Sequence, residues 1–302
     1  MTQTNEAKTE VAKDILGQTE GQETTSQSSE VKHESTLFAE PVFHFGQFAI
    51  TNALLTSWLA VLIIIVLSVM VRKKIASVPR GIQNYAESVL EGAINLANSV
   101  TGSSEKSLKF LPIVFPLFIF ILINNWLGLL PGVGSIGFIE SHGGESIFVP
   151  LLRGGTADLN LTLALALMAV IATHIFGVIT ANAWGHLNRF INIKVLLEIP
   201  KKIFVEKEYT AILVNPIKFF VGLIEAVGEL AKVASLSFRL FGNIFAGEVL
   251  LAAMSAIFAF ILPLPFMFLE IIVGIIQALI FAILTLVFLT VMTSDHEHEE
   301  AH

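Results

Sequence analysis

Long apolar stretches separated by short polar segments dominate the sequence from about residue 50 onward. A helix needs about 20 residues to cross a hydrocarbon layer about 30 Å thick. The stretches have at least this length, so they predict an all-α membrane protein with five to six membrane helices. These helices are expected over about residues 50–71, 110–131, 159–183, 211–262 and 265–292, together with an amphipathic surface helix over about 79–100.

The fourth apolar region is too long for one perpendicular crossing. Its proline-free part, 217–262, has 46 residues and would extend about 69 Å as a helix. Either it contains a turn near one of its glycines, or it forms a helix that is steeply tilted along the membrane. The region 265–292 is also long, and two overlong neighbours suggest a tilted helical pair. The glycines concerned are Gly222, Gly228, Gly242 and Gly247.

The two ends of the chain are polar. Residues 1–42 are rich in acidic residues, Thr, Gln and Ser, and such a segment cannot bury enough apolar surface to offset its ordering entropy. We therefore predict a disordered N-terminal tail over 1–42, a membrane domain over 43–293 and an acidic C-terminal tail over 294–302.

Basic residues indicate the orientation, because short cytoplasmic loops are enriched in Lys and Arg. Six basic residues lie in 72–109 and five in 184–209, whereas the loop 131–158 contains only Arg153. This distribution predicts that the N-terminal tail is outside and the C-terminus is in the cytoplasm.

Composition excludes several classes of function. The chain is 54% hydrophobic and 14% charged, and it contains no cysteine, which excludes disulfides and thiolate metal sites. No dense basic cluster suggests nucleic acid as a ligand. A Gly-x-x-x-x-Gly-Lys-Ser/Thr phosphate loop is absent, so any nucleotide chemistry must occur on another chain. We assign no cofactor and no metal, and interpret the His- and Glu-containing end 294–302 as solvated.

A single arginine interrupts the longest apolar region. A cation at the centre of a membrane helix costs about 3 kcal/mol or more, so Arg239 is a functional hypothesis. Glu225 and Lys232 precede it at seven-residue intervals and share its helix face with Ser235. Glu225 and Lys232 either have a direct functional role, pair with each other as structural partners, or lie near the cytoplasmic surface.

Further polar residues extend this pattern toward the C-terminus. Asn243 flanks the face of Arg239, whereas Glu248 points to about the opposite side, about 13 Å further along the axis. On the last predicted helix, Glu270 and Gln277 are seven residues apart and share a face. Carboxylates and amides at different depths fit two separate paths for an ion.

An arginine suits the barrier between two such paths. Its guanidinium group does not lose its proton in proteins, so it cannot relay a proton from one path to the other. It also attracts a passing carboxylate by about 4 kcal/mol at about 4 Å and an effective dielectric constant near 20. His174, by contrast, is interpreted as a packed residue and not as a proton carrier.

Two other classes of function predict different features of the sequence. A secondary transporter or channel would predict inverted repeats or helices broken at mid-membrane, and the sequence shows neither. A structural membrane anchor would leave the charges inside the apolar regions dispensable.

Four segments resemble subunit a of the F-type ATP synthase. They are Ser237-Phe-Arg-Leu-Phe-Gly-Asn-Ile-Phe-Ala-Gly-Glu248, Gln277-Ala-Leu-Ile-Phe281, Ala157-Asp-Leu-Asn-Leu-Thr162 and Asn125-Trp-Leu-Gly-Leu-Leu-Pro-Gly132. The resemblance covers about residues 43–293 and leaves out both tails.

The resemblance implies a non-catalytic, multi-pass subunit of the bacterial plasma (inner) membrane. Such a subunit holds two offset half-channels against a ring of c subunits, contacts the b subunits of the peripheral stalk, and couples ion flow to rotary ATP synthesis. The translocated ion is taken to be H⁺, although the residues fit H⁺ or Na⁺.

The resemblance also implies roles for individual residues. Arg239 would be the essential arginine and Gln277 its partner on the last helix. Glu270 stands where some relatives have histidine opposite the carboxylate that Glu248 matches, so the two acids could share a proton. The other matching positions of the ion path are Asn243, Glu225, Lys232 and Ser235.

Overall fold

The structure is a computed structural model that describes most of the chain outside its N-terminal segment. The described ranges are residues 38–46, 48–73, 75–76, 80–130, 132–142, 145–181, 211–258 and 261–299. Most of the predicted N-terminal tail therefore lies outside the described residues, as do residues 300–302. The helices belong to one compact unit, Ser35–Gly137 with Pro150–His302.

Helices make up this unit, and the all-α prediction is confirmed. The helices are α2 (Asn52–Lys73), α3 (Ile82–Thr101), α4 (Ser104–Leu129), α5 (Leu159–Ala181), α9 (Ala211–Ile257) and α10 (Pro263–Glu299), with a short 3₁₀ turn, η1 (Gly155–Ala157). In the described part of the chain, five of them are long and apolar enough to cross a membrane, all except α3.

Several helix ends differ from the sequence-based bounds. α4 begins at Ser104 and α10 continues to Glu299, because hydropathy marks the apolar part of a helix while the backbone continues into polar residues. α9 ends at Ile257, before the predicted end at residue 262. α10 begins at Pro263, and proline at the first position suits a helix start.

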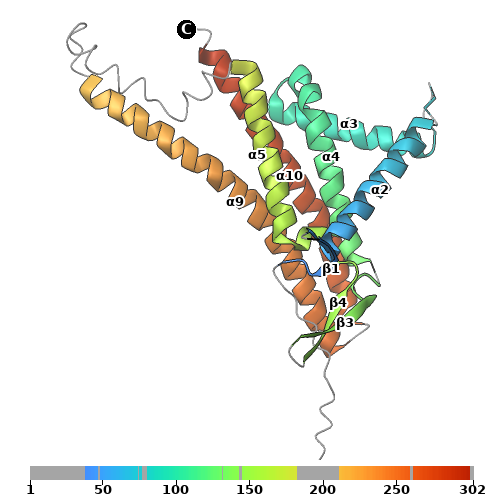
Figure 1. Cartoon of the computed structure of the whole chain (residues 1–302). Helices are drawn as coiled ribbons and strands as arrows, with labels where there is room; N and C mark the ends of the chain where they lie inside the picture. Colours follow the sequence, from blue (N-terminus) through green and yellow to red (C-terminus); the bar gives the residue numbers. More distant parts are fainter. Residues whose placement is uncertain are drawn as a thin grey trace, which may run out of the picture. The chain divides into compact units, whose positions relative to one another are not determined.

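α9 is one continuous helix of 47 residues, so the alternative of a hidden turn is wrong. Its length is about 70 Å. Each glycine inside a helix costs about 1 kcal/mol, which packing of the C-terminal half against α5 and α10 offsets. Figure 1 shows that the N-terminal half extends away from α5. On this half, Ile217, Ile224 and Leu230 are exposed in the chain alone.

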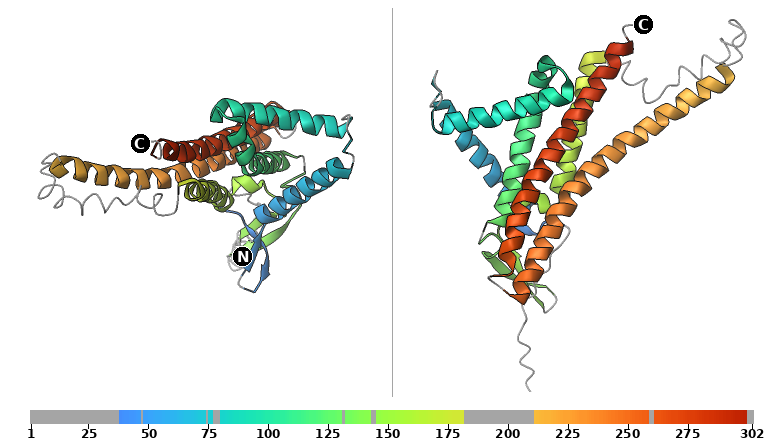
Figure 2. Two further views of the ribbon diagram at one scale, coloured as in Figure 1. Left: turned by 90° about the horizontal axis from the view of Figure 1, so that it is seen from above. Right: turned by 180° about the vertical axis from the view of Figure 1, so that it is seen from behind.

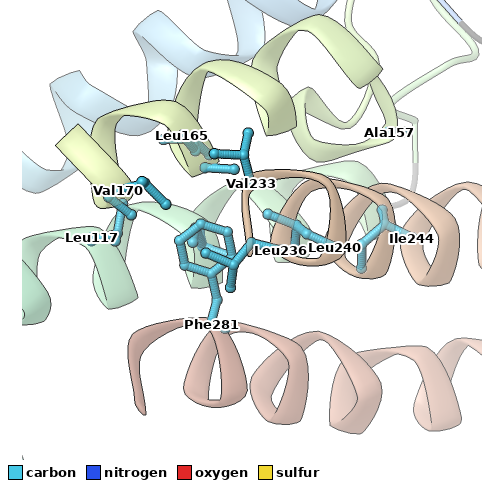
Figure 3. Close-up of a cluster of buried hydrophobic side chains, with 13 residues drawn as sticks. Leu117, Ala157, Leu165, Val170, Val233, Leu236, Leu240, Ile244 and Phe281 are labelled. Atoms are coloured by element: carbon cyan, nitrogen blue, oxygen red, sulfur yellow. The ribbon is translucent and has the colours of Figure 1, made fainter. Parts of the chain in front are cut away.

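α10 is the central helix of the unit, because it packs against α3, α4, α5 and α9 (Figure 2). Leu236 and Leu240 of α9 meet Phe281 of α10 in a buried cluster, to which α5 contributes Leu165 and Val170 (Figure 3). Such close contacts stabilise by dispersion, which also holds helices together in lipid. The cluster therefore determines which face of α9 is turned inward.

A buried polar joint connects α4, η1 and α10. The Asn125 side-chain amide donates to the backbone oxygen of Gly274 at 2.9 Å, and its oxygen accepts from the Thr156 hydroxyl at 2.7 Å. Asn125 and Thr156 are almost fully buried. Loss of the Asn125 side chain would remove both of these hydrogen bonds.

We expect Asn125→Ala to lower the free energy of unfolding by about 1–3 kcal/mol, the usual cost of unsatisfied buried polar groups. The midpoint of thermal unfolding of the purified protein in detergent measures this. Asn84→Ala is the matched control, because Asn84 lies on the exposed side of α3. Equal midpoints for the two variants would contradict a stabilising role for the joint.

Two short antiparallel hairpins accompany the helices. β1 (Pro41–Phe45) pairs with β2 (Phe48–Thr51) directly before α2, so regular structure begins just before the predicted end of the tail at residue 42. β3 (Gly137–His142) pairs with β4 (Glu145–Pro150). Their pattern of apolar residues is too short to have been distinguished from loop in the sequence.

Candidate functional site

Arg239 lies on the exposed side of α9. Leu236 and Leu240 are buried in the core cluster, so the helical period turns the neighbouring Ser235 and Arg239 outward. The Arg239 guanidinium donates from Nη2 to the Ser235 hydroxyl oxygen at 3.2 Å. An exposed cation in an apolar helix requires a polar partner or water on that side.

Asn243 lies one turn after Arg239 and connects α9 to α10. Its side-chain amide donates to the Gln277 side-chain oxygen at 2.7 Å. Gln277 is almost fully buried, and its side-chain nitrogen has no hydrogen-bond partner within the described residues. The structure thus joins Gln277 of α10 to Asn243, which lies one turn after Arg239 on α9.

Glu248 is paired with Arg153, the basic residue of the loop before η1. The Arg153 guanidinium donates from Nε to both Glu248 oxygens, at 2.9 and 3.2 Å, and from Nη2 to one of them at 3.0 Å. Arg153 is only 5% exposed. The sequence contained one indication of this role, because Arg153 is the one basic residue of the loop 131–158.

Glu270 lies on α10 next to this pair. It is 5% exposed, and its Oε1 atom is buried without a hydrogen-bond partner among the described residues. A methyl group added at Gly247 would overlap the Glu270 carboxyl group. Because Gly247 directly precedes Glu248, the Glu270 carboxyl group lies against the same turn of α9 that carries Glu248.

A second polar cluster lies toward the N-terminus of α9. Lys232 Nζ donates to Glu229 at 2.7 Å, and His174 Nε2 of α5 lies 3.6 Å from the other Glu229 oxygen. Lys232 also lies over the Phe288 ring of α10, 4.9 Å from its centroid. Seven-residue spacing pointed to Glu225, which is half-buried, whereas Glu229 is the residue that faces α5.

Arg239 therefore lies between two carboxylate clusters. Glu229 precedes it by ten residues and Glu248 follows it by nine, which places them about 15 Å and about 13 Å away along the helix axis. Within the part of the chain that the structure describes, no group of three or more His, Asp or Glu side chains is arranged to hold a metal ion. The chemistry open to this site is binding and release of small ions.

Comparison with known proteins identifies similar chains. The family model described as ATP synthase A chain matches residues 54–290. ATP synthase subunit a of Trichlorobacter lovleyi is 30% identical over 84% of this chain and 90% of its own length. The subunits of Citrifermentans bemidjiense and Campylobacter jejuni subsp. doylei are 32% and 33% identical, over 82% and 79% of this chain and 89% of each relative.

Proposed function

Because this chain belongs to the ATP synthase A chain family, we propose that it carries ions to and from a ring of c subunits through two offset half-channels. The five long apolar helices agree with a multi-pass membrane protein. One observation carries the proposal: an exposed arginine lies on α9 between two carboxylate clusters at different levels.

Arg239 acts as the barrier between the half-channels. Its permanent charge blocks direct passage of a cation along α9 and attracts the carboxylate of each passing c subunit. Attraction to the guanidinium releases the ion that the c-subunit carboxylate carries. Asn243 lies one turn away on α9 and is hydrogen-bonded to Gln277 of α10. The two residues supply amide groups that keep this part of the path polar.

The two clusters serve as the inner ends of the half-channels. Glu248 and Glu270 line the path on one side of Arg239, and Glu225 with Glu229 and Lys232 form the other. From the distribution of basic residues, the first side faces outside and the second faces the cytoplasm. The membrane is then the bacterial plasma (inner) membrane, with the N-terminus outside.

The c ring covers the exposed face of α9. Ser235, Gly242 and Ala246 are small exposed residues near Arg239, and small residues allow a neighbouring helix to approach closely. A ring against this face also removes the arginine from lipid. Since α9 is about twice as long as a bilayer is thick, we infer that α9 and α10 run steeply tilted along the ring. The b subunits bind elsewhere on this chain.

Continuity of α9 and α10 weighs against a secondary transporter. Transporters of that kind have their substrate sites where membrane helices are broken. Here both polar clusters include side chains of helices that continue without interruption. The chain has no phosphate loop, so it contributes to ATP synthesis without itself carrying out phosphoryl transfer.

The translocated ion is identified by ATP-driven uptake into liposomes that contain the whole ATP synthase. We expect acidification of the lumen, reported by a pH-sensitive dye, at the same rate with and without sodium, and its collapse with a protonophore. Uptake of radioactive sodium that persists with the protonophore would instead assign Na⁺. Absence of any uptake by an assembled, ATP-hydrolysing complex would contradict ion translocation altogether.

A further inference from the structure

Both oxygens of Glu248 are occupied by Arg153. Three N–H···O contacts of 2.9–3.2 Å join the two groups, a forked geometry that a guanidinium forms best. Arg153 is itself held in place. Its backbone N–H donates to the Thr56 hydroxyl at 3.2 Å, and Nη1 donates to the backbone oxygen of Phe38 at 3.3 Å.

Glu270 differs from Glu248 in every one of these respects. One of its oxygens is buried and has no hydrogen-bond partner among the described residues. Its carboxyl group packs against Gly247, where a larger residue would displace it. A buried carboxylate without a partner is costly, so this oxygen is the one available for a proton or another small cation.

We propose that Arg153 is a positioning residue that anchors Glu248 as a carboxylate, and that Glu270 alone binds the translocated ion on this side of Arg239. The inference rests on the proposed ion path and assigns different roles to its two acids. Glu248 then holds α9 to the segment before η1 and supplies a fixed negative charge near the entrance. It does not share a proton with Glu270.

The proposal predicts an unusual pattern of variants. The pair is half-buried, because the Arg153 side chain is 6% exposed and the Glu248 side chain is 30% exposed. Removing one partner of such a pair leaves an unpaired charge, whereas replacing both with neutral groups does not. Arg153→Gln should therefore reduce transport more than the double variant Arg153→Gln/Glu248→Gln. If Glu248 carried the ion, the double variant would not transport ions, because it lacks the Glu248 carboxyl group.

Transport is measured as ATP-driven uptake by the whole ATP synthase in liposomes, normalised to assembled complex. We expect Arg153→Gln to reduce uptake about tenfold or more, and the double variant to recover to within about threefold of the unchanged protein. Glu270→Gln should abolish uptake in both backgrounds. Arg153→Lys keeps the charge without the forked geometry, and we expect it to retain more uptake than Arg153→Gln.

Chemical modification distinguishes the two acids without relying on transport. A hydrophobic carbodiimide reacts with protonated carboxyl groups, and mass spectrometry of this chain locates the product. We expect modification at Glu270 and none at Glu248. Modification of Glu248 in the unchanged protein, or a double variant as inactive as Arg153→Gln, would overturn the proposal.

Arg239→Ala in the same liposomes separates this inference from the function on which it rests. Normal uptake by Arg239→Ala would reject the proposed ion path as a whole. Loss of uptake in Arg239→Ala together with an inactive double variant would reject only the division of roles between the two acids.

Discussion

Replacing Arg239 with alanine is expected to abolish ATP-driven ion uptake by the ATP synthase that contains this chain. The guanidinium contributes about 4 kcal/mol of attraction to a carboxylate about 4 Å away, and loss of that energy corresponds to about a thousandfold. Uptake should therefore fall to background. Passive ion leak through the membrane sector should rise, because the barrier between the half-channels is gone.

Arg72→Ala is the matched control for this prediction. Arg72 lies exposed in the last turn of α2, so the control removes an arginine of the same chain outside the site. We expect uptake close to that of the unchanged protein. Coupled uptake by Arg239→Ala at more than a few per cent of the normal rate would remove the barrier role from Arg239.

A single methyl group at Gly247 is also expected to have a large effect. The group would occupy the place of the Glu270 carboxyl, and overpacking of this kind costs about 1–3 kcal/mol. Gly247→Ala should reduce uptake about tenfold or more, because the displaced carboxyl group no longer lies in the ion path. ATP-driven uptake, normalised to assembled complex, measures the loss.

Two further variants make the Gly247 prediction specific. Glu270→Asp shortens the side chain by one methylene, so its combination with Gly247→Ala should recover part of the uptake. Gly92→Ala in α3 is the control, because a methyl group there meets nothing within 4 Å. If Gly247→Ala and Gly92→Ala transported equally well, the close contact between Gly247 and Glu270 would have no functional role.

The elements of the fold could be predicted because lipid imposes a simple length requirement. Runs of about 20 apolar residues mark membrane helices, and the structure has helices at each of the predicted positions. The exposed position of Arg239 also follows from the helical period around Leu236 and Leu240. The exact helix ends could not be predicted, because hydropathy does not show how far a helix continues into polar residues. The hairpins could not be predicted because their strands are too short to give a clear apolar pattern.

The contacts of the candidate site could not be predicted from residue spacing along one helix. The seven-residue rule selected Glu225, which shares the helix face of Arg239, but Glu229 is the acid that contacts both Lys232 and His174. Spacing along one helix determines which residues share a face. It does not determine which neighbouring helix that face meets.

The pairing of Arg153 with Glu248 could not be predicted either, because the two residues lie far apart in the sequence. The sequence alone was sufficient for the apolar helices and for the isolated arginine in the longest apolar region, because each depends on local composition and helical period. It left open whether that region turns, and the tertiary structure decided that α9 is continuous. The pairing of two side chains 95 residues apart, and the contact of Glu270 with Gly247, depended on how α9, α10 and the segment before η1 pack. Packing is a collective property of side-chain shapes, and no local pattern in the chain encodes it.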